Sequence, residues 1–196
     1  MPRGSGGHQG TSVIEARPPH YVALDRDGTL IRYVPYLTRC KDVELVPSAG
    51  LAIARLNRVG TRVVLVTNQS VVSRGALTLE SLSKIHENVS QLLAQHCAHL
   101  DAILVCPHAS SDQCECRKPR PGLLARYLEQ EMLKPSDGYV VGDNVTDMEL
   151  ALNVGAQPVH VQGGVHSGLE VATRFPNIPS VSDLGAAVDS ILGESK

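Results

Sequence analysis

The stretch Tyr21-Val-Ala-Leu-Asp25-Arg-Asp27-Gly-Thr29 decides the fold of this chain. Its first four residues form a continuous apolar run, which is typical of a parallel strand covered by helices on both faces. Two acidic residues follow this run, and a Gly-Thr turn comes after them. Because ligands of parallel sheets bind beyond the carboxyl ends of the strands, this order of residues predicts a functional site at one sheet edge.

Four more apolar runs follow along the chain, at residues 62–66, 102–105, 139–141 and 158–161. Helical patterns lie between them and after the last one. They occupy residues 47–59, a segment after Thr78, a segment after Pro121-Gly122, a segment that includes Met148 and Leu152, and residues 183–192. This alternation predicts an α/β fold built on a doubly wound parallel sheet.

Length and composition limit the classes of protein that the chain can represent. It has 196 residues, of which 42% are hydrophobic and 19% charged, and a formal net charge of −2. We expect a flexible arm at residues 1–19, which is rich in Gly and Pro, and a single domain at 20–196. The charge balance argues against a nucleic-acid partner, and no apolar run is long enough to span a membrane. We therefore expect a cytoplasmic protein, and a monomer, that binds a small molecule.

Carboxylates follow two of the predicted strands. Asp25 and Asp27 come after the first strand, and Asp143 and Asp147 after the fourth. Carboxylates gathered at one edge repel one another unless a cation lies among them, and hard oxygen ligands suit Mg²⁺. A carboxylate can also attack phosphorus, and a second one can act as general acid and base. The alternative for Asp25 and Asp27 is a simple turn that ends the strand.

Two other segments supply groups that bind phosphate. Thr67 and Asn68 come at the end of the second strand and offer a hydroxyl, an amide and a backbone N–H. Lys118 is a candidate for a fixed positive charge beside a phosphoryl group that is being transferred. Taken alone, each has an ordinary alternative, namely a turn for Thr67-Asn68 and a solvated surface charge for Lys118.

Three of the five cysteines fall within eleven residues, in the order Cys106-Pro-His108-x₅-Cys114-x-Cys116. Three thiolates and one imidazole are a common tetrahedral zinc set with no open position, so we expect structural Zn²⁺ in a loop at 106–116. The alternative is a group of buried thiols beside an incidental histidine. A zinc-clamped loop would hold the next two residues, Arg117 and Lys118, rigidly near the phosphate site.

Taken together, these motifs resemble, in order and spacing, the four motifs of the haloacid dehalogenase (HAD) superfamily. The quoted residues are Asp25-Arg-Asp27-Gly-Thr29, Thr67-Asn-Gln-Ser70, Lys118 and Gly142-Asp143-x₃-Asp147. The resemblance implies a phosphatase in which Asp25 is the nucleophile, Asp27 the general acid and base, and Thr67 and Lys118 stabilise the phosphoryl group. It further implies that Asp25, Asp27 and Asp143 bind Mg²⁺. No insert is long enough to form a large cap domain.

Within the superfamily, the cysteine loop is similar to two families, the D,D-heptose 1,7-bisphosphate phosphatases and the histidinol phosphatases. The heptose family fits the segments around Tyr36, Arg74 and Arg117, whereas the five-residue gap between His108 and Cys114 fits the histidinol type. The first resemblance implies removal of the 7-phosphate of D-glycero-D-manno-heptose 1,7-bisphosphate, with Arg117 reading the second phosphate. A different class, an inactive zinc-stabilised binding module, stays as an alternative. The residues that we expect to contact the substrate are Tyr36, Thr67, Asn68, Gln69, Ser70, Arg117 and Asn144.

Overall fold

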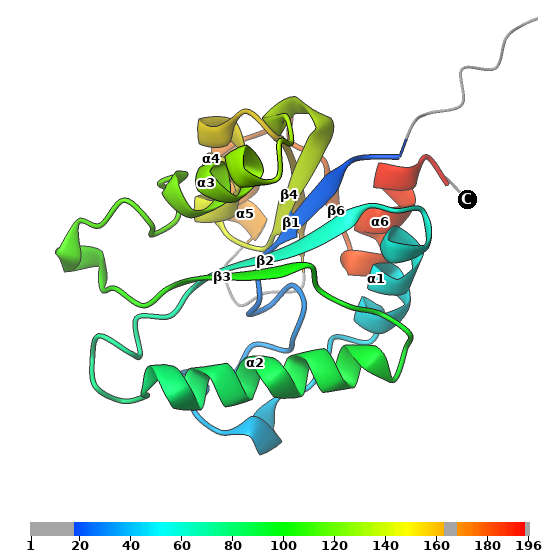
Figure 1. The fold of residues 1–196 in the computed structure, drawn as a ribbon. Coiled ribbons are helices and arrows are strands. Elements are labelled where there is room, and N and C mark those ends of the chain that lie inside the picture. Colours follow the sequence, from blue (N-terminus) through cyan, green and yellow to red (C-terminus); the bar gives the residue numbers. More distant parts are fainter. Residues whose placement is uncertain (1–17, 163–167, 195–196) are drawn as a thin grey trace, which may run out of the picture.

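Six strands form one parallel sheet in the residues that the computed structural model describes, which are 18–162 and 168–194. Their spatial order is β3-β2-β1-β4-β5-β6, so β1 lies in the middle of the sheet (Figure 1). The predicted arm at 1–19 lies almost wholly outside the described residues. The bounds of the strands are Tyr21–Leu24, Arg62–Asn68, Ala102–Cys106, Gly138–Gly142, Gln157–Val161 and Ser180–Val181.

Helices cover both faces of this sheet, as the doubly wound prediction requires (Figure 1). Apolar residues of α1, α2 and α6 form one core with the sheet, and those of α3 and α4 form a second core on the opposite face. The α/β fold class is therefore confirmed. The helices α1 to α6 span Ala49–Arg58, Leu79–Ala94, Gly122–Gln130, Val145–Val154, Gly168–Arg174 and Leu184–Leu192.

Local sequence signals account for several helix ends. The hydroxyl of Thr78 accepts a hydrogen bond from the backbone N–H of Ser81 at 3.1 Å, which makes Thr78 the N-cap of α2 as predicted. Gly155 ends α4 in a left-handed conformation with φ of 86°, where a side chain would be strained. The sequence patterns missed α5 and β6, because the first buries only Val171 and the second has two residues.

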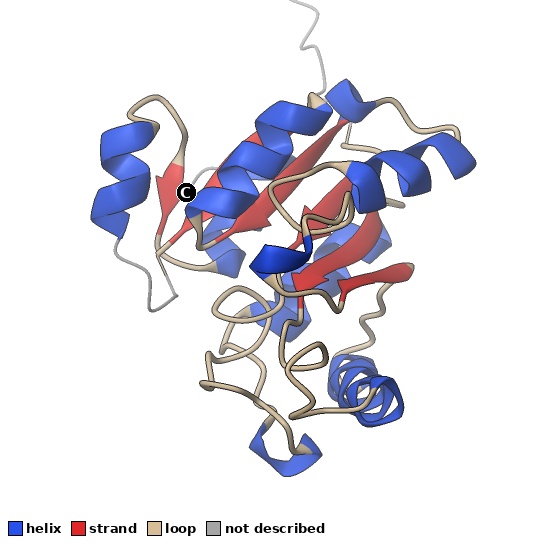
Figure 2. Cartoon of the chain, turned by 90° about the vertical axis from the view of Figure 1, so that its left-hand side faces the viewer, coloured by secondary structure: helices blue, strands red, loops and turns tan. Residues whose placement is uncertain are grey.

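The loops after the strands gather on one side of the molecule. In Figure 2 they lie together below the sheet, and in Figure 1 the loop between β3 and α3 projects to the left. Between β1 and α1, and between β3 and α3, the described chain forms only short 3-10 turns, at Cys40–Asp42 and Ser110–Asp112, and two isolated β-bridges at Ile31. The fold therefore has no large cap, as predicted, and the edge of the sheet opens to solvent through these loops.

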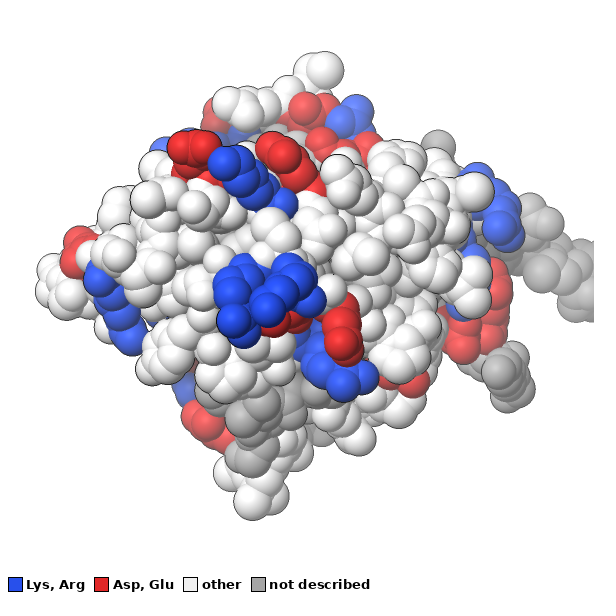
Figure 3. Space-filling view, turned by 90° about the horizontal axis from the view of Figure 1, so that it is seen from below, with Lys and Arg blue, Asp and Glu red and all other residues white. Residues whose placement is uncertain are grey.

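Two surface properties bear on the kinds of partner. Among the described residues, no helix has the length and apolar character needed to cross a membrane. Figure 3 shows one face of the molecule, on which basic side chains near the centre lie directly beside acidic ones. On this face, charges of both signs are thus mixed, in keeping with the small net charge of the whole chain.

Candidate active site

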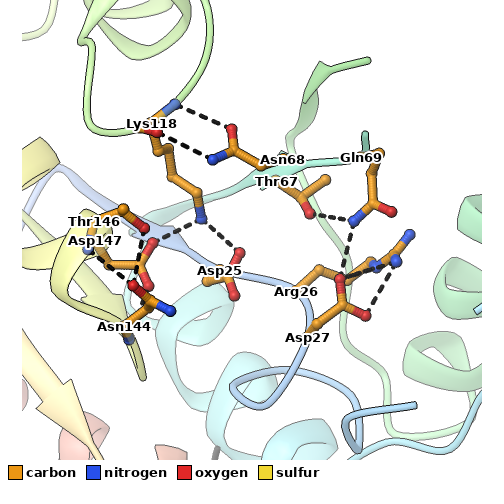
Figure 4. Close-up of polar contacts among 10 residues, drawn as sticks. All are labelled: Asp25, Arg26, Asp27, Thr67, Asn68, Gln69, Lys118, Asn144, Thr146 and Asp147. Atoms are coloured by element: carbon orange, nitrogen blue, oxygen red, sulfur yellow. Dashed lines mark hydrogen bonds and ion pairs between the residues drawn. The ribbon is translucent and has the colours of Figure 1, made fainter. Parts of the chain in front are cut away.

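Lys118 joins two carboxylates at the carboxyl edge of the sheet (Figure 4). Its Nζ donates hydrogen bonds to Oδ1 of Asp25 at 2.5 Å and to Oδ1 of Asp147 at 2.7 Å. The side chain is 5% exposed, so Lys118 is a buried cation and not a solvated surface charge. Burial works against its charge, but the two carboxylates more than offset this and raise the pKa of Lys118 above its usual range.

Asp25, Asp143 and Asp147 form a cluster in which carboxylate oxygens lie within 4.8 Å of one another. Burial is the main cause that raises the pKa of Asp25 to about 7 and that of Asp143 to about 8, and the neighbouring carboxylates add to it. The cluster has one ammonium for three acidic groups. A hard divalent cation fits such an oxygen-rich set, so the residues present fit Mg²⁺.

The carboxylate of Asp27 lies apart from this cluster. It forms an ion pair with the guanidinium of Arg26 at 2.9 Å and accepts a hydrogen bond from Nε2 of Gln69 at 2.9 Å (Figure 4). The structure thus groups Asp147, and not the Asp27 carboxylate, with Asp25 and Asp143. Mg²⁺ binding by Asp27 stays a prediction, and Asp147 is a ligand candidate that the motif contained but that we had not assigned.

The end of β2 supplies three polar side chains with different tasks. Nε2 of Gln69 donates to the hydroxyl of Thr67 at 2.7 Å as well as to Asp27. Asn68 instead pairs with the main chain of Lys118, donating to its carbonyl at 3.1 Å and accepting from its N–H at 3.0 Å (Figure 4). Asn68 therefore fixes the backbone that carries the buried lysine, a role that the turn pattern alone does not reveal.

The four residues of the cysteine cluster lie together and could hold a zinc ion. The Sγ atom of Cys116 lies 3.3 Å from those of Cys106 and Cys114 and 3.1 Å from Nδ1 of His108, and all four groups lie within 4.8 Å of one another. Tetrahedral Zn–S bonds of about 2.3 Å separate sulfur atoms by about 3.8 Å, so the thiols lie about 0.5 Å closer together than around a bound ion. Burial raises the pKa of Cys106 to about 12, so its thiolate needs a nearby cation.

The zinc-binding loop is tied to the rest of the site. It begins at Cys106, which pairs with Asn68 across β2 and β3, and it leads directly to Lys118. Within the loop, Nη1 of Arg117 donates to the carbonyl of His108 at 3.1 Å, so the cluster also helps to hold Arg117. The predicted link between the metal cluster and the two basic residues is thus seen as a hydrogen bond for Arg117 and as direct chain continuity for Lys118.

One cavity of about 460 Å³ is lined by the carboxylate cluster, Asp27, Lys118 and the polar residues at the end of β2. Its lining contains every predicted residue outside the zinc cluster, including Tyr36, Ser70 and Asn144. The prediction that these residues meet at one edge of the sheet is therefore confirmed. The lining also contains two arginines without a predicted role, namely Arg26 of the first quoted motif and Arg74 of a segment that fits the heptose family. The guanidinium of Arg74 lies 6.0 Å from the ring centre of Tyr36, at the distance of a cation–π contact.

Most of the similar curated proteins are heptose bisphosphate phosphatases, but the histidine biosynthesis bifunctional protein HisB of Actinobacillus pleuropneumoniae is also 33% identical over 136 residues, which cover 68% of this chain and 38% of that protein. A family model described as "HAD-hyrolase-like" matches residues 115–187. A curated D-glycero-beta-D-manno-heptose-1,7-bisphosphate 7-phosphatase of Pseudomonas putida is 38% identical over 143 residues, which cover 72% of this chain and 81% of the relative. The corresponding enzyme of Mycobacterium bovis, named for the alpha anomer, is 38% identical over 178 residues and covers 87% and 92%.

A solved structure extends the likeness to three dimensions. It is the D,D-heptose 1,7-bisphosphate phosphatase of B. bronchiseptica, complexed with magnesium and phosphate. The TM-score is 0.82 at 31% sequence identity, and the match covers 89% of this chain and 99% of that one. The similarity therefore extends over most of both chains.

Proposed function

Since the chain belongs to the D-glycero-manno-heptose-1,7-bisphosphate 7-phosphatase family of HAD-like hydrolases, we propose that it removes the 7-phosphate of D-glycero-D-manno-heptose 1,7-bisphosphate. The observation that carries this proposal is the position of Asp25. Its carboxylate lies in a cavity beside Asp143 and Lys118, and three arginines, Arg26, Arg74 and Arg117, line the same cavity. A nucleophile, a cation site and extra positive charge are what a bisphosphate substrate requires.

In the first step, an oxygen of Asp25 attacks the phosphorus of the 7-phosphate. A bond forms between this oxygen and phosphorus while the bond from phosphorus to the sugar oxygen breaks, and an aspartyl-phosphate results. Lys118 donates a hydrogen bond to Asp25 at 2.5 Å, so its ammonium lies next to the reacting group. From there it stabilises the negative charge on the transferred phosphoryl oxygens.

We assign Asp25, Asp27 and Asp143 to Mg²⁺, with Asp147 as a further candidate beside Asp25 and Asp143. When bound, Mg²⁺ supplies positive charge as a Lewis acid next to the phosphoryl oxygens. Thr67 lies at the end of the neighbouring strand, and its hydroxyl is oriented by the hydrogen bond from Gln69. We assign Thr67 to a second contact with the phosphoryl group.

Asp27 is the general acid and base. It protonates the sugar oxygen as that oxygen leaves, and it then takes a proton from the water that attacks the aspartyl-phosphate. The second step releases inorganic phosphate and restores the carboxylate of Asp25. The position of Asp27 supports this assignment, because its side chain lines the cavity two residues after the nucleophile.

The second phosphate of the substrate needs its own cations, since Lys118 is engaged by Asp25 and Asp147. Arg117 and Arg74 line the cavity, and neither forms an ion pair within the part of the chain that the structure describes. We assign Arg117 to the second phosphate. Of the other lining residues that we predicted to contact the substrate, Tyr36, Ser70 and Asn144 are assigned to the sugar, and contacts of Asn68 and Gln69 with the substrate stay predictions.

We also propose that the enzyme acts as a monomer in the cytoplasm. All residues assigned to the reaction come from a single chain and line one cavity. The three zinc-binding thiols are stable in a reducing compartment, where disulfides rarely form. Light scattering on the purified enzyme tests the monomer, and localisation of the tagged protein by cell fractionation tests the compartment.

The substrate proposal is tested by phosphate release from two compounds. We expect a much higher kcat/KM for heptose 1,7-bisphosphate, supplied as both anomers, than for histidinol phosphate. The opposite preference would assign the chain to the histidinol phosphatase reaction instead. Absence of phosphate release from either compound in the presence of Mg²⁺ would contradict both substrate assignments, and absence of release from p-nitrophenyl phosphate as well would favour the binding-module alternative.

A further inference from the structure

Arg26 is a buried arginine between the two catalytic aspartates in the sequence. Its side chain is 2% exposed, which makes it one of the largest fully buried side chains in the described part of the molecule. Nε and Nη2 donate to the two carboxylate oxygens of Asp27 at 3.1 and 3.0 Å. This forked contact fixes both the position and the rotation of the carboxylate plane, as a single hydrogen bond would not.

The third nitrogen of the same guanidinium is held from outside the site. Nη1 of Arg26 lies 3.2 Å from Nε2 of His86, a residue of α2 that is 6% exposed. Because arginine has only donors, Nε2 of His86 accepts this hydrogen bond and the ring proton lies on Nδ1. Burial, and next to it the charge of Arg26, lowers the pKa of His86 to about 4, so its ring is neutral near pH 7.

Asp27 keeps room for one more partner. A carboxylate offers about four lone-pair sites, and two donors from Arg26 and one from Gln69 use three of them. The side chain is 22% exposed and lines the cavity, so one lone-pair site remains on Oδ1 to carry the proton that Asp27 gives to the leaving oxygen. The order of contacts is therefore His86 to Arg26, Arg26 to Asp27, and Asp27 to the cavity.

We propose that His86 is a positioning residue for proton transfer: it locks the buried guanidinium of Arg26, which in turn orients the carboxyl group of Asp27 toward the leaving oxygen. This inference rests on the proposed function, since it concerns the same reaction. His86 and the substrate are separated by Arg26 and Asp27, so His86 acts only through them.

The step that depends on this orientation is the transfer of the Asp27 proton to the sugar oxygen while the bond from that oxygen to phosphorus breaks. A sugar alkoxide is a poor leaving group and needs the proton. A nitrophenolate is a good leaving group and departs without it. Loss of orientation therefore slows cleavage of a sugar phosphate and spares cleavage of p-nitrophenyl phosphate, whereas general damage to the fold slows both.

The test compares His86→Leu and His86→Gln with the wild type on heptose 1,7-bisphosphate and on p-nitrophenyl phosphate. The measured quantity is kcat/KM, because it reports the steps up to release of the leaving group. For H86L we expect a loss of about tenfold or more on the sugar phosphate, since a general acid contributes about 10²–10⁴-fold, and a loss of less than about twofold on the aryl phosphate. H86Q keeps an acceptor for Nη1 of Arg26. Its ratio of kcat/KM on the sugar phosphate to kcat/KM on the aryl phosphate is therefore expected to lie near that of the wild type.

Gln91→Leu is the matched control, because Gln91 is an exposed polar residue of the same helix and lines the same surface groove as His86. It is expected to leave both rates unchanged. Equal losses on the two substrates in H86L, or no loss on either, would overturn the proposal. If H86L does not fold, His86→Ala replaces it with the same expected ratio, because alanine also removes the acceptor for Nη1 of Arg26.

The proposed function can fail separately. If the wild type hydrolyses p-nitrophenyl phosphate but not the heptose bisphosphate, the substrate assignment is wrong. The variants are then compared on histidinol phosphate, or on another alkyl phosphate that the wild type accepts. The expected ratio for His86 is the same there, because it depends on the leaving oxygen and not on the identity of the sugar.

Discussion

The Nζ atom of Lys118 lies 2.5 Å from Oδ1 of Asp25, and the ammonium is shared with Asp147 at 2.7 Å. This buried contact joins the loop after β3 to the end of β1, the two segments that supply the proposed nucleophile and the fixed charge. The relationship makes Lys118 part of both the reaction and the stability of the fold, and this double role is open to measurement.

Lys118→Met is expected to reduce kcat by about 10²-fold or more, because it removes a charge beside the reacting group. It also leaves two buried carboxylates without their partner, which lowers the free energy of unfolding by about 3 kcal/mol. Phosphate release and urea denaturation measure the two effects. Lys84→Met is the control, since Lys84 forms an exposed pair with Glu80 and its loss costs less than about 1 kcal/mol. Full activity in K118M would refute the role of Lys118.

Asn68→Ala is expected to lower kcat by about tenfold, because the two hydrogen bonds to the main chain of Lys118 keep the ammonium in position. The free energy of unfolding should fall by about 1–3 kcal/mol. Asn88→Ala is the control: its amide also donates to a main-chain carbonyl, that of Cys40, at 2.9 Å, but away from the cavity. Equal effects of the two variants on kcat would contradict a specific role for Asn68.

Elemental analysis of the wild type should give about one zinc per chain. Cys116→Ser is expected to lose this zinc, because Cys116 contacts all three other ligand residues. The freed loop would release Arg117 and Lys118, so we expect kcat/KM to fall by about tenfold or more. Cys97→Ser removes an exposed cysteine outside the cluster and should change neither quantity. A fully folded wild type that contains no zinc would reject the metal assignment.

The pKa of His86 predicts a specific response to acid. Its value is about 4 in the folded protein and about 6.5 in the unfolded chain, so the unfolded state binds more protons between these limits. The free energy of unfolding therefore falls as the pH falls from about 6.5 to about 4, by roughly 2–3 kcal/mol from this residue. The measurement is the difference between wild type and H86Q across this range, and a constant difference would contradict the buried neutral ring.

The sequence predicts the sheet edge well because each chemical group follows an apolar strand directly. Asp25, Thr67 and Asp143 needed only the rule that parallel strands end at one edge, and the cavity lining confirms that they meet there. The cysteine cluster was predicted from spacing alone, because three thiols and a histidine within eleven residues leave few other arrangements.

Other features depend on contacts between distant segments, and local patterns do not specify these. The side chain of Asp27 lies with Arg26 and Gln69 because Arg26 is drawn into the core beside His86, which is 60 residues away in the sequence. For the same reason the pairing of Asn68 with the backbone of Lys118 was not foreseen. In the sequence, Asn68 resembles part of an ordinary turn after a strand, and His86 resembles part of an ordinary helix face. Only the tertiary structure shows their contacts.

The most direct test of the account is to identify the product by phosphorus NMR. We predict that the wild type, with Mg²⁺, releases a single equivalent of inorganic phosphate from heptose 1,7-bisphosphate and leaves heptose 1-phosphate. Asp25→Asn, with an unchanged fold by circular dichroism, should release none. Formation of heptose 7-phosphate, or a rate near that of the wild type in D25N, would contradict the proposed reaction and its nucleophile.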